Sequence, residues 1–277
     1  MLQQIREHLH QALVDKYYDN PSNTTLVLLS HIFKQPKSYL LMHDIHELTL
    51  QEEQTLQDVF DQIRQGIPLP YILGEWEFFG KKFLISPDVL IPRPETELLV
   101  EKALEIAQTS KNPRIVDVGT GSGAIILSLA SQIAVGTFFG SDVSRAALNI
   151  AHKNAIRFGL TQISLLQADL LSPFQGQFDL ICANLPYIPR QKLSNLDVAR
   201  SEPILALDGG DDGLLFIRKI ITQASSRLAP KGTILLEIEA SLGDDALTFA
   251  RTIFPKARCK IIEDLSGHDR ILEIHSG

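Results

Sequence analysis

Apolar and polar residues follow two different periods along the chain, and the first period is helical. Between residues 2 and 65, apolar positions recur at helical spacing, as at Leu9 and Leu13, and this pattern predicts mainly helices. The run Thr49–Glu52 has the form of a capping box that opens a helix. We therefore predict a small helical domain over residues 1–66. It carries no recognisable chemistry, so by elimination we assign it to substrate docking.

The helical pattern stops at a segment rich in glycine and proline. Residues 66–70 read Gly-Ile-Pro-Leu-Pro, a composition that breaks helices. Residues 76–85 then hold two aromatic-containing runs around Gly80, which predicts a β-hairpin. We assign residues 67–92 to a linker that contains this hairpin. Beyond it, Pro94 indicates the first turn of another helix.

From residue 114 onward, short apolar runs alternate with amphipathic segments. Such alternation predicts strands separated by helices and packed as a doubly wound sheet. Residues 93–277 are therefore predicted to form an α/β domain with a seven-stranded, Rossmann-like sheet. The expected strands are residues 115–118, 137–141, 163–166, 178–183, 233–238, 260–262 and 270–274.

The composition fits a globular protein and argues against several functions. The 277 residues are 44% hydrophobic and 21% charged, which suits one large domain or two ordinary ones. The net charge of -7 argues against a protein that holds nucleic acid mainly through its phosphates. Cys182 and Cys259 lack the spacing of a metal site, so we expect no metal. Neither a signal peptide nor a membrane-spanning run is evident, and we expect a cytoplasmic protein.

A glycine-rich loop follows the first strand of the predicted sheet. Residues 119–124 read Gly-Thr-Gly-Ser-Gly-Ala, so a ligand can approach the backbone closely. Asp142 follows at about the 20-residue distance expected of a ribose-binding acid in dinucleotide-binding folds. A nicotinamide-dependent dehydrogenase is therefore a competing interpretation, and the loop alone does not decide.

The fourth predicted strand ends abruptly in Asn184-Leu185-Pro186-Tyr187. Pro186 restricts Leu185 and makes a stiff loop at the carboxyl end of the strand, where ligands bind in open α/β sheets. The Asn184 amide and the Leu185 carbonyl are neighbouring acceptors, and Tyr187 adds an aromatic face. This set suits a planar NH2 group, although Asn and Pro are equally ordinary in turns.

Three features favour a methyl donor over a nicotinamide cofactor at this edge of the sheet. Asp117 lies inside the first strand, two residues before the glycines, where it can meet a cationic group. Asp169 follows the third strand and offers an acceptor for an adenine amino group. The segment from Asn184 to Tyr187 reaches the same edge, and no acid or base for hydride transfer is evident nearby.

The glycine loop, the three aspartates and the Asn-x-Pro-Tyr loop together resemble class I S-adenosylmethionine-dependent methyltransferases that act on planar nitrogen. Further motifs resemble the release factor glutamine methyltransferases, and this resemblance covers essentially the whole chain. The matching stretches are Tyr71–Gly74, Val89–Glu97, Ser201–Pro203, Ala206–Gly210 and Asp264–Arg270. One departure is Leu185, where the family usually has proline. Because any residue supplies a main-chain carbonyl, we expect Leu185 to preserve activity.

The resemblance implies methyl transfer from S-adenosylmethionine to the side-chain nitrogen of the glutamine in the Gly-Gly-Gln motif of peptide chain release factors 1 and 2. S-adenosylhomocysteine would be the other product. The implied catalytic and substrate-binding residues are Asn184, Leu185, Pro186 and Tyr187, with Arg93 and Glu97 shaping the pocket. The implied cofactor-binding residues are Asp117, Gly119, Thr120, Gly121, Ser122, Gly123, Asp142, Asp169, Leu170 and Asn184. We expect a monomer.

Two other functions remain open beside the dehydrogenase. A nucleic-acid adenine or guanine amino methyltransferase would use the same loop on an exocyclic amine. Such an enzyme must extrude the base and hold a phosphate backbone, whereas this chain is acidic and has no Lys/Arg-rich run. A non-catalytic protein would bind the cofactor without transferring a methyl group to any partner.

Overall fold

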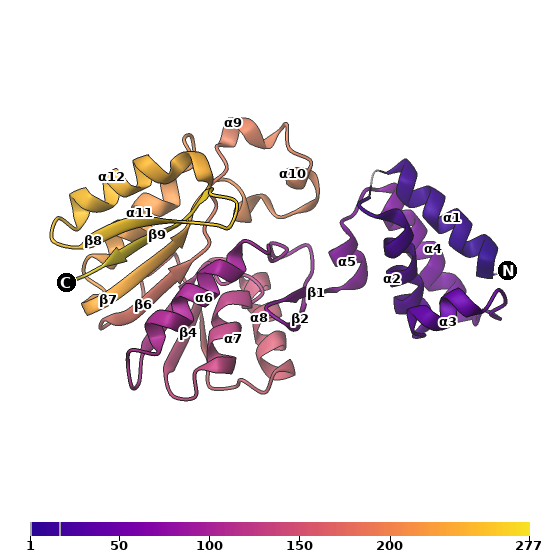
Figure 1. Cartoon of the computed structure of the whole chain (residues 1–277), viewed down its shortest axis with the longest axis horizontal. Coiled ribbons are helices and arrows are strands. Elements are labelled where there is room, and N and C mark those ends of the chain that lie inside the picture. The colour runs from indigo at the N-terminus through magenta and orange to yellow at the C-terminus, as the bar shows by residue number, and fades with distance from the viewer. Residues whose placement is uncertain (1, 17) are drawn as a thin grey trace. The chain divides into compact units, whose positions relative to one another are not determined.

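The computed structural model describes residues 2–16 and 18–277. The chain divides into two compact units, one ending at Glu75 and the other beginning at Trp76 (Figure 1). Residues 69–73, which the sequence assigns to the linker, form helix α5 (Leu69–Leu73) of the first unit, and Ile72 packs in its core. The structural division therefore lies beyond residue 66, because apolar side chains after the proline-rich segment return to the helical core.

The first unit is helical, as predicted. Its apolar core includes Leu9 and Leu13, which recur at helical spacing. The predicted capping box is confirmed: the Thr49 hydroxyl accepts the Glu52 N–H at 3.2 Å, and the Glu52 carboxylate accepts the Thr49 N–H at 2.8 Å. Besides α5, the helices are α1 (Leu2–Asp15), α2 (Pro21–Phe33), α3 (Lys37–Met42) and α4 (Leu50–Arg64).

The predicted hairpin is confirmed as a two-stranded sheet of β1 (Glu75–Phe78) and β2 (Lys81–Leu84). Its turn contains Gly80, whose φ of +68° favours glycine. Phe78 and Phe83 are buried and pack in an edge-to-face arrangement, with ring centroids 6.0 Å apart. The hairpin thus contributes aromatic side chains to the core of the second unit.

Within the described residues, the second unit contains the predicted seven-stranded sheet, in the order β5-β4-β3-β6-β7-β9-β8. The first five strands of this order pair in parallel, whereas β9 is antiparallel to both β7 and β8. The strands are β3 (Arg114–Val118), β4 (Thr137–Asp142), β5 (Ser164–Gln167), β6 (Phe178–Ala183), β7 (Leu228–Glu237), β8 (Arg258–Glu263) and β9 (Asp269–His275). Strand β7 begins at Leu228, whereas the sequence predicted a start at Thr233. The Pro-Lys-Gly segment expected as a turn lies inside the strand, where the pairing with β6 is irregular.

The remaining helical elements are α6 (Thr96–Ala107), α7 (Ala124–Gln132), α8 (Arg145–Arg157), α9 (Arg190–Leu193), α10 (Val198–Ser201), η1 (Ile204–Ala206), α11 (Leu215–Ala224), η2 (Ala240–Leu242) and α12 (Gly243–Ile253). Helices cover both faces of the sheet (Figure 1). Alternate strand residues point to opposite faces. Ile181 accordingly packs with α11 and α12, whereas Leu180 packs with α6 and α7.

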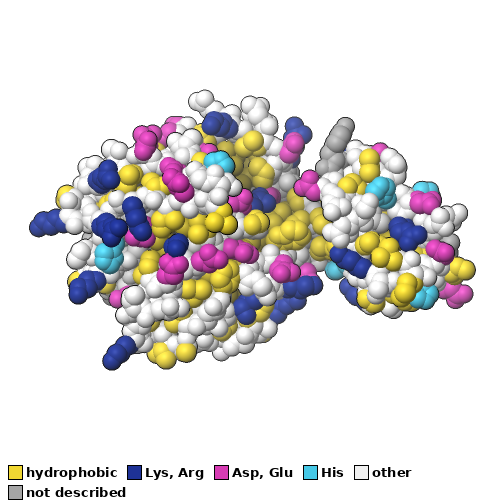
Figure 2. Space-filling model, in the orientation of Figure 1, with side chains coloured by type: hydrophobic (Ala, Val, Ile, Leu, Met, Phe, Trp, Pro, Cys, Tyr) yellow, Lys and Arg dark blue, Asp and Glu magenta, His cyan; other side chains and the backbone are white. Residues whose placement is uncertain are grey.

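No helix in residues 2–16 and 18–277 is both long enough and apolar enough to cross a membrane. On the face shown in Figure 2, Lys and Arg side chains are interspersed with Asp and Glu side chains. That face is therefore mixed in charge.

Candidate active site

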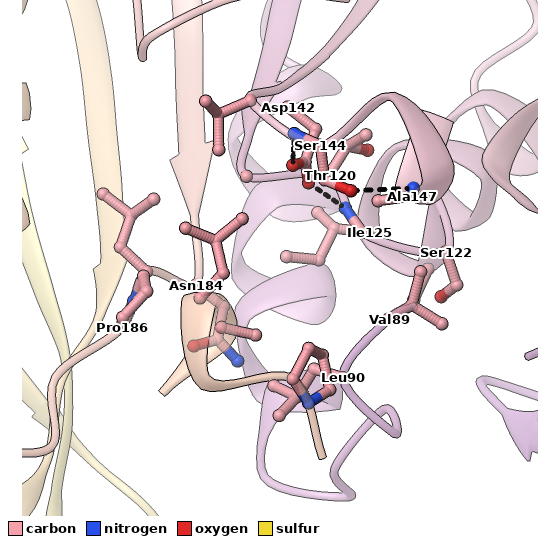
Figure 3. Close-up of a pocket in the computed structure, with 18 of the residues that line it drawn as sticks. Val89, Leu90, Thr120, Ser122, Ile125, Asp142, Ser144, Ala147, Asn184 and Pro186 are labelled. Carbon is pink, nitrogen blue, oxygen red and sulfur yellow. Dashed lines mark hydrogen bonds between the residues drawn. The ribbon is translucent and has the colours of Figure 1, made fainter. Parts of the chain in front are cut away.

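A cavity of about 510 Å³ lies at the carboxyl ends of β3, β4 and β6 (Figure 3). Its volume falls within the roughly 300–1,000 Å³ of small-molecule sites, and its position obeys the rule for ligand binding in open α/β sheets. The predicted site residues that line it are Arg93, Gly119, Thr120, Gly121, Ser122, Asp142, Asp169, Leu170, Asn184, Leu185 and Pro186. The fold thus brings most of the predicted residues to one place.

The glycine loop forms one wall of this cavity. The φ angles of Gly119, Gly121 and Gly123 are +74°, +55° and +84°, which favour glycine at all three positions. A Cβ on Gly119 would lie 2.9 Å from Cδ2 of Leu185, so the loop and the Asn-Leu-Pro-Tyr segment are packed against each other. Gly123 precedes α7 and is not among the lining residues.

Asp142 ends β4 and braces the glycine loop. Its carboxylate accepts the Gly121 N–H at 2.9 Å and the Ser144 N–H at 2.8 Å (Figure 3). Burial raises the pKa of Asp142 above its ordinary value, although these two N–H groups favour the ionised form. Asp142 therefore presents carboxylate oxygens at the cavity while holding the loop that forms the adjacent wall.

Asp117 does not line the cavity, although the sequence places it among the cofactor-binding residues. Its side chain is fully buried, and its carboxylate accepts the Thr120 hydroxyl at 2.6 Å. Burial raises the pKa of Asp117 to about 7, against the opposing effect of this hydrogen bond. The structure thus shows Asp117 behind the loop, where it contacts Thr120, which does line the cavity.

Of three further predicted residues, Asp169 and Leu170 flank the cavity after the end of β5, whereas Glu97 lies away from it. Asp169 is exposed at the cavity, and Leu170 is buried with a positive φ of 54°. Glu97 does not line the cavity. Its carboxylate instead accepts the backbone N–H of Phe79 at 2.8 Å. Glu97 therefore fastens the hairpin turn to α6, a contact that sequence reasoning did not anticipate.

Asn184 follows β6 and is held by a hydrogen-bonded chain from two buried residues. Its Nδ2 donates to Oγ1 of Thr96 at 3.1 Å, and this hydroxyl donates to Oε2 of Glu237 at 2.6 Å. Burial raises the pKa of Glu237 to about 7, while the bond from Thr96 and the nearby Arg270 oppose that shift. We call this the Asn184–Thr96–Glu237 relay.

Tyr187 lines a smaller cavity of about 200 Å³ beside the first one. Arg93, Asn184 and Leu185 line both cavities. Burial raises the pKa of Tyr187 to about 12, with Glu237 adding to the shift. The Tyr187 phenol is therefore neutral at about pH 7. The residues that follow β6 lie between the larger cavity and the smaller one.

The backbone after Tyr187 is clamped by the Ala206–Gly210 stretch. Ile188 and Asp208 form an isolated parallel bridge, in which the Ile188 N–H donates to the Leu207 carbonyl at 3.0 Å. The Gly209 N–H donates to the Ile188 carbonyl at 2.8 Å, and a Cβ on Gly209 would lie 2.7 Å from the Tyr187 backbone. This motif therefore positions the loop through main-chain contacts that leave no room for a side chain.

The Val89–Glu97 stretch is fastened by Glu202, which is only 7% exposed. One carboxylate oxygen of Glu202 accepts the Ile91 N–H at 3.0 Å, and the other pairs with the Arg93 guanidinium. Charge-assisted bonds of this kind are strong. Glu202 thus connects the Ser201–Pro203 motif to the Val89–Glu97 motif, which is far away along the chain, beside the cavity.

Sequence reasoning gave no role to Thr96 and did not single out Glu237. A signal for Glu237 exists, because it is an acid near the end of the otherwise apolar run 234–238, at the edge where ligands bind. Thr96 lies inside a matched motif, but its partner is 141 positions away along the chain. Their pairing follows from the packing of α6 on the sheet.

Comparisons with known proteins agree with this architecture. The chain matches a family model described as PrmC N-terminal domain over residues 4–74 and one described as Methyltransferase domain over residues 109–247. A release factor glutamine methyltransferase from Haemophilus influenzae is 36% identical, over 96% of this chain and 97% of its own length. One from Moorella thermoacetica is 41% identical, over 76% and 75%. The solved structure of a methyltransferase from Pyrococcus furiosus shares the fold, with a TM-score of 0.54 at 17% identity, over 72% of this chain and 91% of that one.

The mostly parallel sheet, the cavity at the carboxyl ends of its parallel strands and the matched domain define this protein as a methyltransferase. The identities over nearly the full length settle the family. The chain belongs to the release factor glutamine methyltransferase family, as the sequence motifs indicated.

Proposed function

We propose that this protein transfers a methyl group from S-adenosylmethionine to the side-chain nitrogen of the glutamine in the Gly-Gly-Gln motif of peptide chain release factors. The observation that carries the proposal is that Asn184 and Leu185 line both cavities. A planar amide entering the smaller cavity would meet these acceptors where the larger cavity begins. The names of the relatives support the same substrate.

The larger cavity fits S-adenosylmethionine, whose bound sulfonium supplies an electrophilic methyl group. Gly119 and Gly121 offer bare backbone to the amino-acid part of the cofactor. Asp142 would accept hydrogen bonds from the ribose hydroxyls, and Asp169 and Leu170 would border the adenine. Asp117, by contrast, would act through the loop by holding Thr120.

The loop after β6 would make the substrate amide reactive. An amide nitrogen is a weak nucleophile because its lone pair is delocalised into the carbonyl group. Asn184 Oδ1 and the Leu185 carbonyl would accept its two hydrogen atoms, which raises electron density on the nitrogen and directs it at the methyl group. Tyr187 would pack against the amide plane and fix its tilt.

Orientation would supply most of the rate acceleration, for which well-aligned reactants gain roughly 7–11 kcal/mol. The amide nitrogen would form a bond to the methyl carbon while the bond between that carbon and sulfur breaks and leaves its electron pair on sulfur. The nitrogen would then lose one proton to water. No basic side chain is needed for this sequence of events. Pro186 and Arg93 would keep the loop and the cavity wall in place rather than take part in bond changes.

We also propose that the helical unit docks the release factor and that residues 93–277 carry the chemistry. Release factors work on ribosomes in the cytosol, so we place the protein there, acting as a monomer. Light scattering of the purified protein would test the monomer, and a deletion of residues 1–75, the whole first unit, should raise KM for the release factor more than it lowers kcat.

The test of the reaction is the intact mass of a purified release factor after incubation with this protein and S-adenosylmethionine. A factor whose Gly-Gly-Gln glutamine is replaced serves as the matched control. We expect one added methyl group on the normal factor and none on the control. Methylation of both would move the target elsewhere. Methylation of neither, with cofactor binding measured separately, would favour an exocyclic amine of nucleic acid as substrate.

A further inference from the structure

Two buried polar side chains connect Asn184 to the interior of the second unit. Thr96, the first residue of α6, is 4% exposed, and Glu237, the last residue of β7, is 2% exposed. Polar groups buried this deeply cost free energy unless they are hydrogen-bonded. Their hydrogen bonds to each other and to Asn184 satisfy that requirement. In each of these bonds the donor and the acceptor are fixed.

The direction of the Asn184–Thr96–Glu237 relay follows from the number of protons available. A threonine hydroxyl has one proton, and an ionised carboxylate can only accept. Once Thr96 donates to Glu237 at 2.6 Å, its oxygen has only lone pairs left for Asn184. Asn184 must therefore present its NH2 group to Thr96, as the 3.1 Å bond from Nδ2 shows. Its Oδ1 then points away from the relay.

We infer that Thr96 and Glu237 are positioning residues that lock the Asn184 amide with Oδ1 directed at the substrate, so that Glu237 must be ionised for methyl transfer. This inference deepens the proposed function and rests on it. The two ends of an amide are alike in shape and opposite in hydrogen bonding. If the amide turned around, its NH2 group would oppose the NH2 group of the substrate.

Protonation of Glu237 would reverse the relay. A protonated carboxyl group can donate to Thr96, which frees the Thr96 proton to bond Asn184 Oδ1 and turn the amide. The charged groups that face Glu237 are Arg270, which favours its ionised form, and Glu95, which opposes it. Tyr187 also faces it and stays neutral. Because burial raises the pKa of Glu237 to about 7, the working direction is present above that pH and is lost below it.

Kinetics give the first test. The wild-type kcat for the release factor should fall by about tenfold per pH unit below about pH 7. Glu237→Gln, which keeps the shape of the side chain, should remove this limb. Thr96→Val should lower kcat at about pH 8 by about tenfold, the scale of one hydrogen bond. Because Thr96 also lines the larger cavity, cofactor affinity is measured beside it by calorimetry and should change by less than about threefold. Thr96→Ser, which keeps the hydroxyl, should restore kcat to within about twofold.

An NMR titration gives a second test that needs neither cofactor nor substrate. The side-chain NH2 signals of Asn184, assigned by their loss in Asn184→Ala, should shift with a midpoint near pH 7. The same signals should not titrate in Glu237→Gln. Circular dichroism would verify that each variant is folded.

The two tests separate the inference from the proposed function. An NMR titration that Glu237→Gln abolishes supports the relay, even if the wild type methylates no release factor and the proposed function fails. Asn184 signals that stay constant between about pH 6 and 9 would overturn the relay. A Glu237→Gln enzyme that keeps the acidic limb, or a Thr96→Val enzyme with normal kcat, would overturn it as well.

Discussion

Replacing Asn184 with alanine removes the amide that the proposed mechanism places on the substrate nitrogen. The residue lies where the two cavities share a lining. Its Nδ2 donates to Oγ1 of Thr96 at 3.1 Å, and its side chain also favours the ionised form of Glu237 through a hydrogen bond. After truncation, Thr96 keeps its bond to Glu237. The structural loss is therefore limited to side-chain hydrogen bonds, each worth about 1 kcal/mol of unfolding free energy, and the fold should survive.

The catalytic loss should be much larger than the structural one. Removing a single preorganised polar group from an active site lowers kcat by about 10²–10³-fold in comparable cases, or about 3–4 kcal/mol of barrier. Cofactor affinity should change by less than about threefold, because the glycine loop and Asp142 are retained. Asn184→Ala thus separates binding from methyl transfer.

The assay is the initial rate of methyl transfer to a release factor, beside calorimetric titration with S-adenosylmethionine. Asn149→Ala is the matched control, because Asn149 is exposed on α8 and does not line the cavity. We expect the control to be fully active. Near-normal turnover of Asn184→Ala would refute the proposed role of the amide, and loss of cofactor binding would reassign it to the cofactor site.

Three further variants test other parts of the site. Glu202→Ala should lower the unfolding free energy by about 3 kcal/mol in urea denaturation, because it leaves Arg93 and the Ile91 N–H without their buried partner; an unchanged urea midpoint would contradict this. The pKa of Asp117 is about 7 in the folded protein and 3.8 ordinarily. Its contribution to the unfolding free energy is therefore fully present below about pH 4 and is lost as pH rises through 7. Between about pH 4 and 7, the unfolding free energy of the wild type should accordingly fall by up to about 4 kcal/mol relative to that of Asp117→Asn. Parallel curves of unfolding free energy against pH would disprove this prediction. Leu185→Pro keeps the main-chain carbonyl, so kcat should stay within about threefold; a collapse of kcat would show that the leucine side chain, packed on Gly119, matters for turnover.

The strand pattern and the loops at strand ends were readable from the sequence because they depend on local features. The glycines of the loop at 119–123 need positive φ angles, and the apolar runs of β3 to β6 are short and cleanly bounded. Parallel strands carry their carboxyl ends to one edge. That rule alone brings Asp142 and Asn184 to the same cavity.

The features that the sequence did not reveal depend on contacts between distant residues. Glu202 and Ile91 are 111 positions apart, and Thr96 and Glu237 are 141 apart. No periodicity links such pairs. Asp117 shows the reverse problem, because its spacing from the glycines suggested a ligand contact, whereas the strand buries it behind Thr120. Burial of a single polar residue is a property of the packed sheet.

Localisation of the methyl group tests the central claim most directly. A release factor incubated with this protein and S-adenosylmethionine would be digested and sequenced by tandem mass spectrometry. We predict a methyl group on the side-chain nitrogen of the Gly-Gly-Gln glutamine, and none when Asn184→Ala replaces the wild type. A methyl group on another residue, or an unmodified glutamine in a reaction that consumes the cofactor, would contradict the account.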